Sequence, residues 1–255
     1  MSGMRGIGPD GFRVFEHDPR TARWAQAALE VAREVAANTA LQGPENLRHG
    51  KTWFVGVDAL PNDTDGRIGG VPLEGPWQDY VPQLPLHPAQ LSIVYQGYPQ
   101  QDPQESDANH RFRRDRSAAH VDGLLPIGPE RRRFAREFHA YILSLPLNDV
   151  AASPTVVWPQ SHHIMQHALR VAFTGRAPSE VDITQAYAAA RKRVFEECTP
   201  IPLVLRPGQS ALLHPFILHG TQAWGNETDI SDQGRMIAFF RPECAGGAPE
   251  WLATP

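Results

Sequence analysis

Three residues in two separate segments have the side chains and the spacing needed to hold a metal ion. His120 and Asp122 stand one residue apart in the segment 118–123. In an extended chain, residues two apart point to the same side, so an imidazole nitrogen and a carboxylate oxygen can approach one point. Two ligands from one segment need a third from elsewhere. His219, in the apolar segment 211–220, is the candidate.

Two histidines and one carboxylate on one face of an octahedron form the facial triad of non-haem Fe(II) oxygenases, which leaves the opposite face open for a co-substrate and oxygen. A zinc site for hydrolysis on the same residues is an alternative, but it would want a general base nearby, and the sequence offers no candidate. His214 is a rival third ligand. Five positions from His219 along a strand, it would point to the opposite face, so we predict that His120, Asp122 and His219 bind the metal.

Two arginines in the apolar run 235–241 indicate a site for a carboxylate. A guanidinium suits this role because its planar fork can pair with both carboxylate oxygens at once. Arg235 and Arg241 share one side of the predicted strand, so facing alone cannot choose between them. Arg235 lies nearer to His219 in the sequence, whereas Arg241 stands beside Pro242, where the strand should end. We therefore predict Arg235 as the carboxylate clamp and Arg241 as an exposed ion pair.

These features resemble the Fe(II)/2-oxoglutarate-dependent dioxygenases, and within them the phytanoyl-CoA dioxygenase-like branch. The resemblance covers roughly residues 90–242 and rests on His120-Val-Asp122, the segment 153–163, Pro207-Gly208 before a strand, His219-Gly220 and the late arginine. In the segment 153–163, Gln160 stands where the family usually has glycine. The resemblance implies Fe(II), 2-oxoglutarate as co-substrate and O2, with hydroxylation of a small organic substrate and release of succinate and CO2.

A mainly β fold is expected, a double-stranded β-helix or jelly-roll core with flanking helices. Residues 1–255 would form a single domain. Residues 1–88 would supply an N-terminal helix and a region that covers the barrel mouth, and residues 89–242 the core, with a helical insertion at about 178–198. By analogy with the family, Tyr95 or Gln96 could touch 2-oxoglutarate, although a core or surface role is open for each.

Sequence periodicity predicts the elements of this fold. Strands are expected over 51–57, 89–98, 141–147, 155–158, 201–205, 210–213, 217–219 and 235–240. Helices are expected over 19–37, where Asp18 can cap the first turn, over 182–198, and over a short stretch at 129–139. The stretch 58–88 has little periodicity, so it is either a substrate-side loop, with Trp77 and Tyr80 as its contacts, or irregular surface chain.

Two basic clusters bracket the His120-Val-Asp122 segment, one within residues 111–116 and one at residues 131–133. A charge run is usually a solvated loop, but two such clusters at one active-site mouth would favour an anionic substrate. The candidate substrate contacts are Arg116, Arg131 and Trp224. The adjacent His162 and His163 are expected to be structural rather than metal ligands.

The composition of the chain limits the classes of partner. With 255 residues and a net charge of -4, it has no basic footprint for nucleic acid. Two cysteines cannot form a disulfide framework, and there is neither an apolar leader nor a long apolar run. We expect a cytoplasmic protein with a small-molecule substrate and no nucleic-acid or membrane partner, its oligomeric state left open. The competing hypothesis is a cupin-like metal or small-molecule binding protein without turnover.

Overall fold

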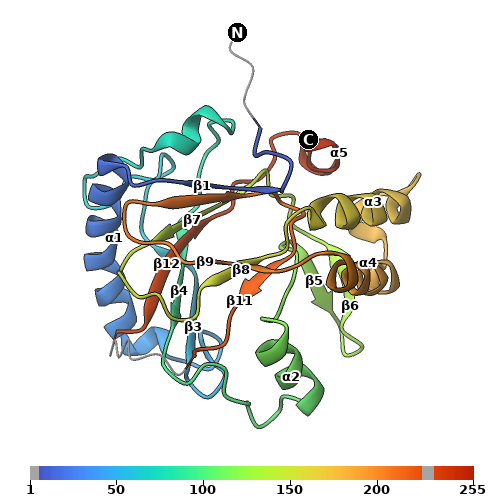
Figure 1. The fold of residues 1–255 in the computed structure, drawn as a ribbon, viewed down its shortest axis with the longest axis horizontal. Coiled ribbons are helices and arrows are strands. Elements are labelled where there is room, and N and C mark those ends of the chain that lie inside the picture. Colours follow the sequence, from blue (N-terminus) through green and yellow to red (C-terminus); the bar gives the residue numbers. More distant parts are fainter. Residues whose placement is uncertain (1–5, 226–232) are drawn as a thin grey trace.

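The computed structural model describes residues 6–225 and 233–255, and two antiparallel sheets form its centre (Figure 1). The larger sheet has the order β1-β10-β7-β12-β4-β3-β2, and the smaller has the order β11-β8-β9. The strands of the larger sheet are β1 (Phe12–Phe15), β2 (Leu47–Arg48), β3 (Trp53–Leu60), β4 (Ala89–Val94), β7 (Ile142–Pro146), β10 (Ser210–Leu213) and β12 (Arg235–Phe240). Those of the smaller sheet are β8 (Thr155–Val157), β9 (Ile201–Leu203) and β11 (His219–Thr221).

The inner faces of these two sheets pack against each other. Ile142 and Ile237 of the larger sheet share one buried apolar cluster with Val157 and Leu203 of the smaller sheet. Residues two apart along a strand face the same way, so Arg235 and Phe239 lie on this inner face of β12 together with Ile237. The arrangement confirms the predicted double-stranded β-helix with flanking helices.

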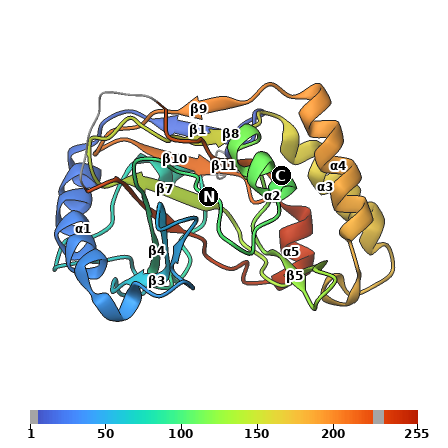
Figure 2. The same ribbon diagram turned by 90° about the horizontal axis from the view of Figure 1, so that it is seen from below.

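Helices flank the sheet pair on two sides. Figure 2 shows α1 on one side of the sheets and α3, α4 and α5 on the other. The helices are α1 (Pro19–Ala37), α2 (Asp107–Asp115), α3 (Ser161–Phe173), α4 (Thr184–Glu197) and α5 (Gly247–Ala253), with short 3-10 turns η1 (Thr39–Leu41), η2 (Pro76–Asp79) and η3 (Pro178–Glu180). Within the described ranges, no helix combines the length and the apolar character needed to cross a membrane.

Helix α1 has the bounds that its sequence predicts. The Asp18 side chain accepts hydrogen bonds from the backbone amides of Arg20 and Thr21, so it caps the first turn, and Pro19 stands just inside. Trp24 is fully buried against the outer face of the larger sheet, with its ring 5.6 Å from that of Phe240. The helix thereby covers the apolar face of the larger sheet that is turned away from the barrel interior.

The irregular stretch between β3 and β4 packs mainly on this outer face as well. Trp77 is buried in the cluster that contains Trp24, and the Tyr80 ring lies 5.2 Å from Phe15. The expectation that Trp77 and Tyr80 contact substrate at the barrel mouth is therefore wrong. Apolar contacts with α1 and the sheet edge hold these side chains away from the mouth.

Three local expectations differ from the structure. Residues 129–139 form no helix but part of a hairpin of β5 (Leu124–Ile127) and β6 (Arg132–Ala135), because Gly128 and Arg131 adopt positive φ in its turn. The basic stretch expected as a loop contains α2, which Ser106 caps. The third difference is α3, which follows directly after Gln160 where a loop was expected.

Candidate metal centre and its cleft

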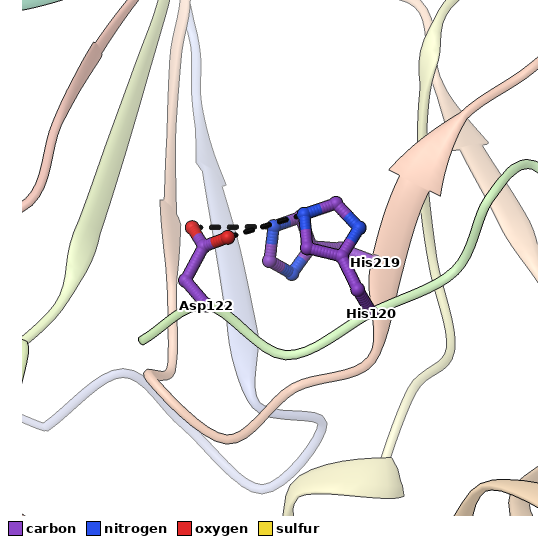
Figure 3. Close-up of side chains that lie close together, drawn as sticks. All are labelled: His120, Asp122 and His219. Carbon is purple, nitrogen blue, oxygen red and sulfur yellow. Dashed lines mark ion pairs between the residues drawn. The ribbon is translucent and has the colours of Figure 1, made fainter. Parts of the chain in front are cut away.

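The structure brings His120, Asp122 and His219 together (Figure 3). One ligand atom from each lies within 4.8 Å of the others, which makes the three a candidate metal-binding group. The Nε2 atom of His120 is 3.1 Å from Asp122 Oδ1, and the Nε2 atom of His219 is 3.5 Å from Asp122 Oδ2. His219 and Asp122 are largely buried, whereas the side chain of His120 is 39% exposed toward the cleft.

Hydrogen bonds of the two imidazoles fix which nitrogen faces the centre. His120 Nδ1 is 3.0 Å from the carbonyl oxygen of Ala118, and His219 Nδ1 is 3.1 Å from that of Ile217. A carbonyl can only accept, so each Nδ1 carries the proton and a neutral ring keeps its Nε2 lone pair free. Metal-ligating histidines are commonly oriented in this way. The donor set therefore fits a cation between the two Nε2 atoms and the carboxylate.

A close backbone approach holds the two ligand segments together. His120 and His219 exchange both backbone hydrogen bonds, at 2.8 and 3.0 Å, in an isolated antiparallel bridge. The next residue is Gly220, and a Cβ atom at this position would lie only 2.1 Å from the carbonyl oxygen of Ser117. The glycine of the His-Gly pair is thus required by packing. Its absence of a side chain lets the strand carrying His219 approach the segment before His120.

The side chain of Arg241 lies inside this centre. Its Nε donates a hydrogen bond to Asp122 Oδ2 at 2.5 Å, and its Nη1 donates to Gln90 Oε1 at 2.9 Å. Burial raises the pKa of the Asp122 carboxyl, but Arg241 and the two imidazoles outweigh it and hold that pKa well below its usual range. The predicted exposed ion pair is wrong, since the Arg241 side chain is only 13% exposed. Alternation along β12 carries this residue to the inner face.

Arg235 lies at the other end of β12 and is buried within the barrel. The residue is 4% exposed, and its Nε and Nη1 atoms have no hydrogen-bond partner among the described residues. Burial lowers the pKa of Arg235 to about 10, so the guanidinium keeps its charge at neutral pH. An unpaired buried cation is costly. This end of the interior is therefore suited to an anionic ligand.

Two hydroxyl groups near Arg235 are also without partners. Thr155 lines both the metal cleft and a small cavity of about 10 Å³ that Arg235 lines. The hydroxyl groups of Thr155 and Tyr98 are buried and unpaired among the described residues. Burial raises the pKa of Tyr98, and the positive charges of Arg113 and Arg235 oppose this rise. The sequence pattern did not single out Thr155 or Tyr98.

The candidate co-substrate contacts Tyr95 and Gln96 lie elsewhere. Tyr95 packs against the outer core beside α1, because it shares the face of Leu91 and Ile93 on the strand. Gln96 follows the end of β4 at Val94 and is exposed. Neither residue lines the metal cleft or the small cavity of Arg235.

A cleft of about 900 Å³ opens from the metal centre to the surface. Of the candidate substrate contacts, Arg131 lines this cleft, whereas Arg116 is exposed with its guanidinium over the Phe195 ring. Trp224 donates its backbone amide to Tyr98 and does not line the cleft, and most of the polar loop after it falls outside the described residues. Arg48 and Arg191 line the cleft and were not singled out in the sequence.

The other histidine candidates lie away from the metal centre. The chain turns between His214 and His219, and the rings of His214 and His162 are 4.7 Å apart in a separate buried pair. His214 bonds through Nε2 to the carbonyl oxygen of Pro255. Gln160 adopts φ 65° immediately before α3. This left-handed conformation favours glycine, which accounts for the residue that the resembling family has there.

Comparison with known proteins gives a likeness in fold alone. No family model and no curated protein matches the sequence. EctD from S. alaskensis, solved with bound Fe, is similar over 95% of this chain and 75% of that chain, with 14% identity and a TM-score of 0.53. The non-heme alpha ketoglutarate dependent carbocyclase SnoK from nogalamycin biosynthesis matches over 95% and 86%, with 14% identity and a TM-score of 0.45. This chain is a double-stranded β-helix protein that carries a His-Asp-His group at its mouth.

Proposed function

We propose that this protein is an Fe(II)- and 2-oxoglutarate-dependent oxygenase that hydroxylates a small organic substrate, with release of succinate and CO2. One observation carries the proposal. The barrel interior holds a His-Asp-His group suited to a cation. It also holds, on the inner face of β12, the buried Arg235 guanidinium, which lacks a counter-ion among the described residues. A 2-oxo acid with a distal carboxylate answers both requirements with one molecule.

The roles of the residues follow from their positions. His120, Asp122 and His219 would hold Fe(II), which supplies O2 activation coupled to oxidative decarboxylation of the oxo acid. Arg235 would pair with the distal carboxylate, and the hydroxyl group of Thr155, between the cleft and the Arg235 cavity, would donate to it. A charged bidentate pair in a water-poor interior gives both affinity and orientation. The fold shared with EctD, solved with bound Fe, supports this assignment.

The alternative of a metal-binding barrel without turnover accounts for the triad but not for Arg235. A barrel that binds only a metal gains nothing from an uncompensated guanidinium, whose burial costs stability. On the sequence features given above, we also propose that the chain is a single domain, cytoplasmic, and a member of the phytanoyl-CoA dioxygenase-like branch.

The test uses the full chain under anaerobic conditions. Fe(II) and 2-oxoglutarate are added together, and formation of the complex is followed by its visible charge-transfer absorption. Oxygen is then admitted, and conversion of 2-oxoglutarate to succinate is measured by NMR. We expect one Fe(II) per chain, a band that requires both components, and slow succinate formation even without substrate. Asp122→Ala should lose the band. Full iron binding with no 2-oxoglutarate-dependent band would contradict the proposal.

A further inference from the structure

Two arginines form part of one wall of the cleft, and both lie against the same aromatic ring. Arg133 lies on β6 and Arg191 on α4, and both line the cleft. Their guanidinium carbons lie 4.6 and 5.2 Å from the centre of the Tyr187 ring. Arg191 also lies 4.5 Å from the centre of the Phe112 ring on α2. Cation-π contact with these rings holds the two guanidinium groups at the cleft wall, where each is a neighbouring positive charge of the other.

Neither guanidinium has a carboxylate partner among the described residues. Arg133 donates from Nη1 to the carbonyl oxygen of Leu124 at 2.6 Å, and Arg191 makes no side-chain hydrogen bond to the described chain. The contrast within α4 is informative, because Arg193 forms a two-contact ion pair with Glu197 at 2.6 and 3.1 Å. Helix α4 therefore pairs its outward arginine and leaves the cleft arginine unpaired.

The acidic side chains of the cleft are engaged elsewhere. Asp58 bonds to His87 at 2.8 Å, and Glu137 bonds to His139 at 3.1 Å. Glu243 accepts from the backbone amide of Phe138, and Asp122 pairs with Arg241. None of these four carboxylates pairs with Arg133 or Arg191.

Burial makes this arrangement costly without a ligand. Desolvation lowers the pKa of Arg133, and the neighbouring charges of Arg191 and Arg131 lower it further, with only Tyr187 opposing. Like charges that approach without a counter-ion repel each other, and part-burial weakens the screening of that repulsion by solvent. An anion at this wall would remove the repulsion. The side chains already have the planar geometry that pairs with oxyanions.

We infer that Arg133 and Arg191 form a subsite for an oxyanion group of the organic substrate, and that this group is a dianion such as a phosphate monoester. Its role as a substrate subsite rests on the proposed oxygenase function, but binding of the anion itself does not. Two unpaired guanidinium groups, with Arg131 beside them, match a charge of -2 better than that of one carboxylate. Leu124 and Phe112 give the same cleft apolar surface for the body of the substrate.

The substrate would thus be held at two separated points. Arg133 and Arg191 would bind its charged end, and the bond to be oxidised would lie at the metal centre, in the same cleft. A cleft of about 900 Å³ accommodates a small molecule that spans both. Anchoring a remote, unreactive group in this way selects the position that meets the oxidant.

The experiment measures anion binding to the full chain in the absence of added metal, so that no ion can recruit the probe. Inorganic phosphate and acetate are titrated in parallel by calorimetry at low ionic strength. The variants are Arg191→Gln and Arg133→Gln. Arg191 makes no side-chain hydrogen bond on which the fold depends. The matched control is Arg193→Gln, which lies on α4 like Arg191. Arg235→Gln reports any phosphate bound in the barrel interior, and Mn(II) titration of each variant reports the metal centre separately.

We expect phosphate to bind more tightly than acetate and to weaken as salt is raised. Arg191→Gln and Arg133→Gln should each reduce phosphate affinity by about tenfold to a hundredfold, the loss expected for one charge-assisted hydrogen bond. Arg193→Gln should leave it unchanged, any phosphate bound beside Arg235 should be lost only in Arg235→Gln, and Mn(II) binding should survive in Arg191→Gln.

Several results would overturn the inference. Equal phosphate affinity in wild type and Arg191→Gln would contradict the subsite, and so would a loss in Arg193→Gln as large as that in Arg191→Gln. Acetate that binds as tightly as phosphate would contradict the inference that the ligand is a dianion. If instead phosphate binding depends on Arg191 but the chain binds no metal, the oxygenase proposal fails while the anion subsite stands.

Discussion

The guanidinium of Arg241 and the carboxylate of Asp122 form a direct hydrogen bond, Nε to Oδ2 at 2.5 Å, between the end of β12 and the segment that carries two of the three candidate metal ligands. A carboxylate that shares its oxygens between a metal and a fixed donor cannot rotate freely. Under the proposed function, Arg241 would be a positioning residue for the candidate metal ligands, and β12, which carries both Arg235 and Arg241, would support both ends of the proposed site.

Loss of Arg241 should weaken metal binding. Removing a side chain that orients a metal ligand typically costs about tenfold to a hundredfold in metal affinity, so we expect a loss of that size for Arg241→Ala and a smaller one for Arg241→Lys. Calorimetric titration with Mn(II), followed by anaerobic Fe(II) titration, measures it. Arg206→Ala is the control, because Arg206 forms an exposed pair with Asp149. Unchanged affinity in Arg241→Ala would show that the contact is incidental.

The choice between His219 and His214 as third ligand is tested by a paired substitution. His219→Ala removes one of three ligand side chains and should abolish stoichiometric iron binding. His214→Ala should retain one iron per chain, since His214 packs beside His162 and not at the centre. Iron content after anaerobic loading and desalting distinguishes the two. The assignment is wrong if the iron contents are reversed.

Arg235 should have opposite effects on stability and on ligand binding. Replacing the unpaired buried guanidinium by an apolar chain of similar length, Arg235→Met, should stabilise the ligand-free protein by about 1–4 kcal/mol. The same change should eliminate the rise in melting temperature that 2-oxoglutarate gives in the presence of Mn(II). Thermal melts with and without 2-oxoglutarate measure both effects. A variant that retains the 2-oxoglutarate-dependent rise would locate the carboxylate clamp elsewhere.

The buried pair of His162 and His214 predicts a loss of stability in acid. Desolvation lowers the pKa of His162 to about 4 and that of His214 to about 3, so both stay neutral in the folded chain over a range where they are protonated when unfolded. The unfolded chain therefore binds more protons below the ordinary histidine pKa of about 6.5, and the free energy of unfolding falls as pH falls from about 6.5 to 4.

Each such proton lowers the free energy of unfolding by about 1.4 kcal/mol per pH unit in this range. Urea denaturation at several pH values measures how steeply the free energy of unfolding changes with pH. His214→Gln should reduce this slope by close to the contribution of one proton. His167→Gln, at an exposed position on α3, the helix that carries His162, serves as control. A slope that is the same in His214→Gln and wild type would refute this origin of the acid sensitivity.

The parts of the fold that the sequence predicted share strong local signals. The strand of Arg235 and the helix of Trp24 appear as predicted because apolar periodicity and an N-cap determine them locally. The α2 helix was missed because it buries no residue, so its sequence has no apolar stripe. The hairpin at 124–135 depends on positive φ at Gly128 and Arg131, which the charged pattern conceals.

The candidate site divides in the same way. Ligand type and the His-x-Asp spacing singled out His120 and Asp122, although His120 lies in an isolated bridge and Asp122 in a turn rather than on a strand. His219, far away in the sequence, was added by ligand type and by the resemblance. The contact between Arg241 and Asp122 could not be predicted, because it depends on the tertiary fold bringing the end of β12 beside the segment 118–123, which is far away in the sequence. Arg191 lay in a helix whose pattern indicated only an apolar face, and its exposure to the cleft depends on how α4 packs against β6 and α2.

The backbone bridge between His120 and His219 also bears on how the protein folds. It joins positions roughly 100 residues apart, so its loop-closure entropy must be overcome before the contact contributes, and contacts of this range form slowly. Stabilising interactions that are absent from the folding transition state slow unfolding more than they accelerate folding. An ion held by His120, Asp122 and His219 would therefore mainly lower the unfolding rate and so extend the lifetime of the native state.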